Sequence, residues 1–337
     1  MAAPPKWSSR RFPGVIAGML LLLGAAVLVS LSLGRYPIPL TALVARLFNV
    51  PFASAQMEAV FFNVRLPRIA LACLVGTALA AAGASYQGVF RNPLAAPDIL
   101  GASSGAATGA ALAILLRLPA PLITIFAFSS SFLTIVLVMF IGDRVRGKKI
   151  LGLILAGMMI SSLNSAAVSF MKLTADPNNV LPEIVFWLMG SLAKTRAADV
   201  FFVLIPMVLG ITPLIVLRWR INLLTLSDDE AQSMGVNVRR TRAVVIISST
   251  LLTAAAVSVS GIIGWAGLVI PHLTRRIAGN DYRRLMPASM VFGAFFLLVI
   301  DNVSRNLFAT EIPLGILTSL VGAPFFLWLI TRKGDLW

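Results

Sequence analysis

Cysteine and histidine are nearly absent from this sequence, which holds one of each among 337 residues. The single cysteine, Cys73, cannot form a disulfide within the chain, and a zinc centre needs several His, Cys or carboxylate ligands. A serine hydrolase would need a histidine partner and a Gly-x-Ser-x-Gly turn on a strand-to-helix elbow, and no such elbow is predicted for the lone histidine, His272, to serve. We therefore predict no catalytic residue, no metal site and no cofactor bound by this chain.

Charge is also scarce, since only 12% of the residues are charged and 58% are hydrophobic. Soluble domains carry about 25% charged residues, so the composition predicts a polytopic membrane protein. The apolar runs are about 18 to 22 residues long and lack the alternation of barrel strands, which predicts an all-α helix bundle. The net charge of +15 fits Lys and Arg flanking membrane spans better than nucleic-acid binding, because no basic run is interleaved with aromatic residues.

We expect ten membrane spans, with the whole chain, 1–337, forming one transmembrane domain. The positive-inside rule places both termini in the cytoplasm, because about two thirds of the Lys and Arg then flank the inner ends of the spans. The outer segment 172–199 contains an apolar piece too short to span, which we expect to form a re-entrant or interfacial helix. The expected spans are 14–33, 66–89, 99–116, 121–142, 150–171, 200–217, 243–262, a short eighth span at 264–275, 286–300 and 313–331.

Two sequence patterns concern packing and symmetry. Gly101, Gly105 and Gly109 recur every four residues, so they share one helix face and predict close approach of a neighbouring helix. The stretches 65–95 and 239–273 both run from an Arg pair through an Ala triplet to Gly and Pro, and they start on opposite sides of the predicted membrane. This indicates an inverted repeat, a feature typical of transporters.

The 13 acidic residues are all expected in loops or near span ends, so that no span centre carries a charge. A secondary transporter coupled to ions usually keeps a carboxylate at membrane depth, so the energy for transport is expected to come from another chain. The stretch "GDRVRGKK" (142–149) imitates a phosphate loop but has Lys149 where Ser or Thr should follow the lysine, and we reject nucleotide binding. A secondary transporter and a membrane scaffold without a pore remain as alternatives.

Three of the few acids are consecutive in "LSDDEAQSMGV" (226–236). Ser227 is a typical N-cap, the acids Asp228, Asp229 and Glu230 suit the first turn of a helix, and Gly235 suits its end. The apolar face of this short helix would be formed by Leu226, Ala231 and Met234. By itself the pattern fits either a docking helix or a solvated loop helix.

Four motifs resemble the permease subunits of ABC importers for ferric siderophores, haem and cobalamin. They are "RLPRIALACLVGTALAAAGASYQGVFRNPLAAPDILGASSGA" (65–106), "LSDDEAQSMGV" (226–236), "GLVIPHLTRRIAG" (267–279) and "DNVSRNLFATEIPLGILTSLVGAPFFLWLI" (301–330). The resemblance implies a type II importer in a bacterial inner membrane, built from two such permeases, two ATPase subunits that bind ATP and Mg, and a periplasmic substrate-binding protein. A metal chelate is the expected cargo, and an oxyanion such as molybdate is the alternative.

The resemblance also implies roles for particular residues. Segment 218–242 would be the cytoplasmic coupling loop, folded into two short helices, with 226–236 contacting the ATPase. Arg65, Arg68 and Arg305 would dock acidic residues of the binding protein, whereas the alternative is that they anchor span ends at lipid headgroups. The bulky residues Ile150 and Leu151 would lie at an inner gate. Asn92-Pro93 and Pro97 should break the chain between the second and third spans.

Overall fold

The computed structural model describes residues 12–145 and 149–331, which form helices and no strand. Residues 146–148 of the stretch that imitates a phosphate loop lie outside this part. The helices are α1 (Phe12–Ser32), α2 (Leu40–Leu47), α3 (Ala55–Ala59), the π-helical segment η1 (Val60–Arg65), α4 (Leu66–Val89), α5 (Ala102–Leu115), α6 (Ala120–Arg144), α7 (Lys149–Thr174), α8 (Val180–Met189), α9 (Ala197–Leu224), α10 (Asp228–Ser233), α11 (Val238–Ser260), α12 (Ala266–Ala278), α13 (Tyr282–Asn306) and α14 (Leu314–Thr331).

A helix occupies each of the ten predicted spans, and seven of the described helices are long and apolar enough to cross a membrane. The third predicted span is shorter than expected, because α5 has 14 residues. The eighth, predicted to be short, is α12 with 13 residues. The apolar piece of segment 172–199 forms the ten-residue α8, and its relation to the membrane surface stays a prediction.

Helix α4 is the centre of the bundle, and every residue from Ala78 to Val89 is buried. Its small residues allow backbones to come close: a Cβ placed on Gly76 would lie 2.2 Å from the carbonyl oxygen of Gly293 in α13. A Cβ on Gly83 would lie 1.7 Å from the carbonyl oxygen of Gly267 in α12. Small residues take this role in membrane bundles because lipid supplies no hydrophobic drive between helices.

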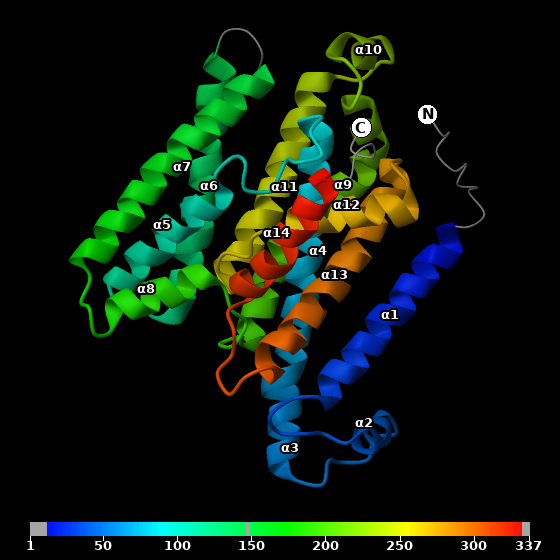
Figure 1. Ribbon diagram of the computed structural model, residues 1–337, viewed down its shortest axis with the longest axis vertical. Coiled ribbons are helices and arrows are strands. Elements are labelled where there is room, and N and C mark those ends of the chain that lie inside the picture. Colours follow the sequence, from blue (N-terminus) through cyan, green and yellow to red (C-terminus); the bar gives the residue numbers. More distant parts are fainter. Residues whose placement is uncertain (1–11, 146–148, 332–337) are drawn as a thin grey trace.

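The two stretches of the predicted repeat form α4 and α11, which pack together and run in opposite directions (Figure 1). The Tyr86 hydroxyl of α4 lies 2.7 Å from the Thr250 hydroxyl of α11. Each long helix is followed by a break and a short helix, and the residue before that short helix has a left-handed backbone, Gly101 with φ 83° and Trp265 with φ 64°. This arrangement fits an inverted repeat of a long helix, a break and a half-length helix.

Gly105 and Gly109 of the predicted glycine face pack α5 against α6, as the sequence predicts, whereas Gly101 precedes the helix and meets Ser161 of α7 instead. A Cβ on Gly105 would lie 2.3 Å from the Thr134 hydroxyl, and one on Gly109 would lie 2.2 Å from the Phe126 carbonyl oxygen. The break predicted at Asn92-Pro93 and Pro97 is also present, since residues 90–101 contain no helix.

One end of the bundle carries α10 and the junction between α12 and α13, and the opposite end carries α2, α3 and the loop 307–313 (Figure 1). We call these the inner end and the outer end. Asp301 lies near a span end, as expected of the acids, but it is buried. Helix α13 extends to Asn306 rather than ending near 300, so Asp301 lies inside the helix with no exposed surface.

Candidate coupling and docking sites

The inner-end candidate is α10, whose short length is offset by local capping. The Ser227 hydroxyl accepts a hydrogen bond from the Glu230 amide at 3.2 Å, and the Glu230 carboxylate accepts one from the Ser227 amide at 2.9 Å. This reciprocal arrangement is a capping box. The helix ends before Gly235, which has φ 79°, a left-handed backbone that favours glycine. The predicted cap and stop residues are confirmed.

Asp228 ties α10 to the rest of the chain rather than facing a partner. Its carboxylate accepts hydrogen bonds from Arg242 of α11 at 2.9 and 3.3 Å, and from Arg91 after α4. Arg91 also donates to the Leu224 carbonyl oxygen at 2.9 Å. The hydrogen bond from Arg242 is the largest cause that lowers the pKa of Asp228, so the carboxylate remains charged at neutral pH.

The three acids of the coupling segment therefore have different roles. Asp228 anchors, Glu230 caps, and Asp229 makes no hydrogen bond or ion pair with any described residue. The predicted apolar face needs a correction, because Ala231 is fully buried against the chain itself. Leu226 and Met234 are 38% and 55% exposed, so they belong, together with the exposed Asp229, to the surface that is open to a partner.

The segment 218–242 contains one short helix in place of the two that the resemblance implies. Helix α9 continues to Leu224, and α11 begins at Val238, where the Asn237 side chain accepts from the Arg240 amide at 2.9 Å. The coupling segment is thus a short capped helix held between the ends of two long helices.

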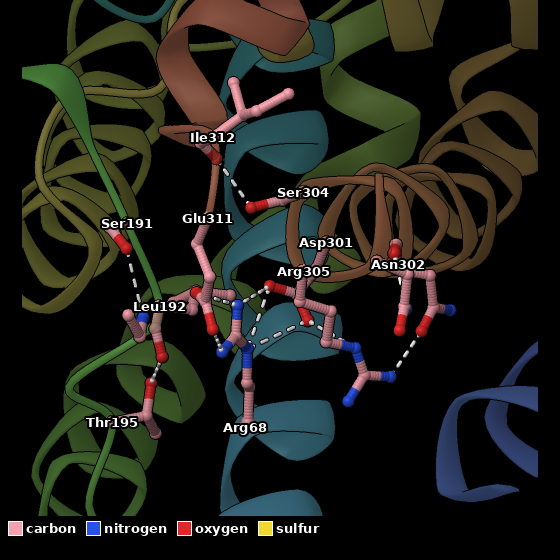
Figure 2. A network of polar contacts seen from close by, with 12 residues as sticks. Arg68, Ser191, Leu192, Thr195, Asp301, Asn302, Ser304, Arg305, Glu311 and Ile312 are labelled. Atoms are coloured by element: carbon pink, nitrogen blue, oxygen red, sulfur yellow. Dashed lines mark hydrogen bonds and ion pairs between the residues drawn. The ribbon is translucent and has the colours of Figure 1, made fainter. Parts of the chain in front are cut away.

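At the outer end, Arg68 joins two carboxylates (Figure 2). Its guanidinium lies 3.0 Å from Asp301 through Nε and 2.9 Å through Nη2, and it reaches Glu311 at 3.0 Å through Nη1 and 2.9 Å through Nη2. The side chains of Arg68 and Asp301 are 7% and 0% exposed, and that of Glu311 is 25% exposed. The pairing connects α4, α13 and the loop before α14.

Arg305 and Arg65 are also enclosed by their own chain. Arg305 donates to the Ser30 carbonyl oxygen at 2.9 Å, and its Nε lies 3.9 Å from Asp301. Arg65 donates to the carbonyl oxygens of Leu31 and Tyr36. Docking of a binding protein by Arg65, Arg68 and Arg305 stays a prediction, but none of the three is the exposed rim charge that it assumes. We call Arg68, Arg305, Asp301 and Glu311 the outer arginine cluster.

The comparisons with known proteins place the chain in a family. The profile of the FecCD transport family matches residues 20–332. The chain belongs to the FecCD transport family. It is 40% identical to the molybdate import system permease protein of Haemophilus influenzae, over 94% of each chain. It is also 40% identical to the hemin transport system permease protein of Yersinia pestis, over 96% of this chain and 97% of that one.

A solved structure of a metal-chelate type ABC transporter in an inward-facing conformation has the same fold. It superimposes with a TM-score of 0.86 at 40% identity and covers 94% of this chain and 99% of that chain. This FecCD protein is therefore a multi-pass permease of an ABC importer. Family membership, rather than the distribution of acids, decides against a secondary transporter.

The predicted inner gate of this FecCD permease lies in the first turn of α7. Ile150 packs against the core, and Leu151 is exposed. The two residues are neighbours on one helix, and a gate also needs a second segment that closes against them. The inner gate therefore remains a prediction. The partners of Arg68, namely Asp301 and Glu311, were missed from sequence. The one signal was the four-residue spacing of Asp301 and Arg305, which places both on one helix face.

Proposed function

We propose that this permease imports a metal chelate from the periplasm into the cytoplasm of a bacterium, as one half of a homodimer in the inner membrane. Two ATPase subunits supply the energy, and a periplasmic binding protein delivers the cargo. The observation that carries the proposal is the match of the FecCD family over almost the whole chain. The relative from Yersinia pestis carries hemin in its name, and the solved relative is of metal-chelate type.

The geometry of α10 supports its role as the contact with the ATPase. A docking element has to keep its shape while force passes through it, and the capping box and the Asp228 pairs hold α10 to α4 and α11. The exposed side chains of this segment include Asp229, whose carboxylate makes no ion pair with a described residue, and the apolar Leu226 and Met234. A charged group beside apolar contacts suits the rim of a protein interface.

A homodimer is supported by the apolar surface that one chain leaves open. The side chains of Leu163, Phe170 and Leu173 in α7 are 66 to 82% exposed. Helix α7 is also long and apolar enough to cross a membrane. A second permease and lipid are the two environments that can cover such a surface. Two copies related by a two-fold axis would use the same face of each chain.

Charge reversal at Asp229 tests the coupling role. Asp229→Lys leaves the capping box and the Asp228 pairs in place, so the permease should assemble with the ATPase and remain folded. We expect ATP hydrolysis stimulated by the loaded binding protein to fall about tenfold or more, since reversing a charge at an interface costs on the order of 2 kcal/mol. The assay uses the complete complex in liposomes.

The matched control is Glu183→Lys, which reverses an exposed acid in α8 at the outer end. It should leave stimulated hydrolysis near the level of the unaltered complex. Full stimulation in the Asp229→Lys complex would remove α10 from the coupling mechanism.

Molybdate is the second candidate cargo, because one relative of 40% identity is named as a molybdate permease. The same liposomes distinguish the two. Accumulation of a ferric chelate without molybdate supports the first candidate, and the reverse supports the second.

A further inference from the structure

Asp98 lies in the break between α4 and α5. The structure places this break deeper in the helix bundle than the predicted spans indicate. The break packs against the middle of α7, where a Cβ on Gly157 would lie 2.6 Å from the Ile99 carbonyl oxygen. A Cβ on Gly101 would lie 2.5 Å from the Ser161 hydroxyl of the same helix. With a rise of 1.5 Å per residue, these positions are roughly 12 to 18 Å from the inner end of α7.

That depth is close to the middle of a membrane, since the hydrocarbon core is about 30 Å thick. The length of α5 gives the same result from the other side, because its 14 residues place the break roughly 21 Å from the outer end. Asp98 thus lies in a loop, as expected, but this loop enters the bundle.

The Asp98 carboxylate has one hydrogen-bond partner but no counter-ion. It accepts from the Ser103 amide at 2.8 Å, and none of the ion pairs among residues 12–145 and 149–331 includes it. Helix α5 contains no charged residue, and the basic residues of α7 are confined to its ends, at Lys149 and Lys172. As a residue, Asp98 is exposed at the surface of the single chain.

An exposed carboxylate at this depth cannot face lipid at a small energetic cost. Acidic residues within membrane spans face the bundle interior or a water-filled cavity and mark substrate pathways. In several transporter folds the binding region lies near the midplane, where a broken helix exposes a half-helix N-terminus. Asp98 stands just before such a half-length helix, so the exposed surface around it belongs to an aqueous path.

Polar side chains continue from Asp98 along the neighbouring helices. The Asn164 amide of α7 donates to the Thr134 hydroxyl at 3.2 Å and to the Ser104 hydroxyl at 3.4 Å. The Thr108 hydroxyl donates to the Asn164 carbonyl oxygen at 3.3 Å. These groups have uncharged partners within the chain, so Asp98 is the only acidic or basic residue of this polar layer among the described residues.

We propose that Asp98 lines the translocation pathway at mid-depth and makes it selective for metal chelates that are neutral or cationic. A fixed negative charge lowers the local concentration of anions and raises that of cations. In a homodimer, two copies of Asp98 would act on the same pathway. The inference rests on the proposed function for its cargo class, and it disfavours molybdate and other anions as cargo.

Access to the position is tested with cysteine labelling, which needs no cargo. The background is Cys73→Ser, which removes the one natural cysteine, and the reporter is Asp98→Cys in the complete permease–ATPase complex in liposomes. We expect membrane-impermeant methanethiosulfonate reagents to modify the reporter in at least one nucleotide state. Absence of modification with and without ATP would show that Asp98 faces lipid or a dry subunit contact, and would overturn the proposal.

The charge effect is tested at a second reporter, Ser161→Cys, whose hydroxyl lies next to the break. Its rates with a cationic and an anionic methanethiosulfonate reagent are measured with Asp98 and with Asp98→Asn. We expect the ratio of cationic to anionic rates to fall about fivefold or more in Asp98→Asn, because a unit charge a few ångströms away shifts both rates in opposite directions. The control reporter Phe48→Cys, which is 77% exposed at the outer end, should keep its ratio.

An unchanged ratio at Ser161→Cys, or no reaction there in any state, would remove Asp98 as the source of selectivity. An import assay then tests which class of cargo the pathway selects. Asp98→Asn should raise uptake of an anionic ferric chelate relative to a neutral one by about fivefold, in line with the potential removed, and equal ratios in both proteins would contradict the proposal. If neither chelate is imported but the labelling behaves as expected, the proposed function is wrong. The inference that Asp98 lines an aqueous pathway would still hold.

Discussion

At the residue scale, the outer arginine cluster depends on how one guanidinium divides its donors. Arg68 uses Nε and Nη2 for Asp301, and Nη1 and Nη2 for Glu311. Because Asp301 has no exposed surface, water cannot replace Arg68 if the arginine is lost. A buried ion pair adds little net stability compared with apolar residues, but removal of one partner leaves a buried charge uncompensated.

We therefore expect Arg68→Ala to destabilise the permease by about 3 to 5 kcal/mol. The midpoint of thermal unfolding in detergent measures this effect. The matched control is Arg46→Ala, because Arg46 and Glu58 are partly exposed and 3.9 Å apart, and a pair of this kind contributes about 1 kcal/mol at most. If Arg68 acted only in docking a binding protein, both variants would unfold at the temperature of the unaltered protein.

At the element scale, α4 is held by contacts that only glycine permits. Gly76 meets Gly293 of α13 and Gly83 meets Gly267 of α12, backbone against backbone. A helix packed this closely on two sides cannot shift along its axis without separating from both neighbours. Helix α4 is thus the fixed reference against which the breaks before α5 and α12 are positioned.

Gly83→Ala should destabilise the bundle, since the added Cβ would lie 1.7 Å from a carbonyl oxygen that belongs to the backbone and cannot rotate away. Overpacking of this kind costs about 1 to 3 kcal/mol or more. The measurement is thermal unfolding of the purified permease. Gly24→Ala in α1 is the control, because nothing lies within 4 Å of its added Cβ, and it should unfold at or slightly above the original temperature. Equal midpoints for the two variants would contradict the close contact.

The elements differ in how far the sequence predicts them. The end of α4 matches the predicted span, because Asn92-Pro93 after it is a local signal. Its start does not, because α3, η1 and α4 form one continuous helix from Ala55. The cap and stop of α10 are also local, at Ser227, Glu230 and Gly235. The short length of α5 has no local signal in the sequence. It follows from the packing of residues 99–101 against the middle of α7.

The candidate site residues follow the same division. Sequence position predicts that Arg65, Arg68 and Arg305 lie near the outer ends of their helices. Whether they face solvent depends on the partners that other helices bring, and Asp301 and Glu311 come from segments more than 230 residues away from Arg68. The same applies to Ala231, whose apolar character fits an exposed docking face or a buried contact equally well, and which is buried.

At the scale of the whole molecule, the proposed function gives the two ends of the bundle different roles. The inner end presents α10, with Met234 exposed, and the outer end presents the segment before α3, with Phe48 exposed. Long helices join the ends, and the predicted topology places the inner end in the cytoplasm. The division into an outer receiving end and an inner coupling end follows from this orientation.

Cysteine labelling in cells tests the orientation. On the Cys73→Ser background, Phe48→Cys should react with an impermeant maleimide added outside spheroplasts, because it lies at the outer end. Met234→Cys should react only after the membrane is permeabilised. Reaction of Met234→Cys in intact spheroplasts would place both termini outside and invert the assignment of the two ends.

The ion pair between Arg68 and Asp301 also bears on how the chain is made. The two residues are separated by 233 positions, so α4 leaves the ribosome long before α13 exists. Until then, Arg68 has no buried counter-ion and its guanidinium must stay with water or lipid headgroups near the outer interface. Insertion is therefore completed from the C-terminal part of the chain: the arrival of α13 and the loop before α14 allows Arg68 to become buried, and a nascent chain shorter than about 310 residues has not yet closed this end of the bundle.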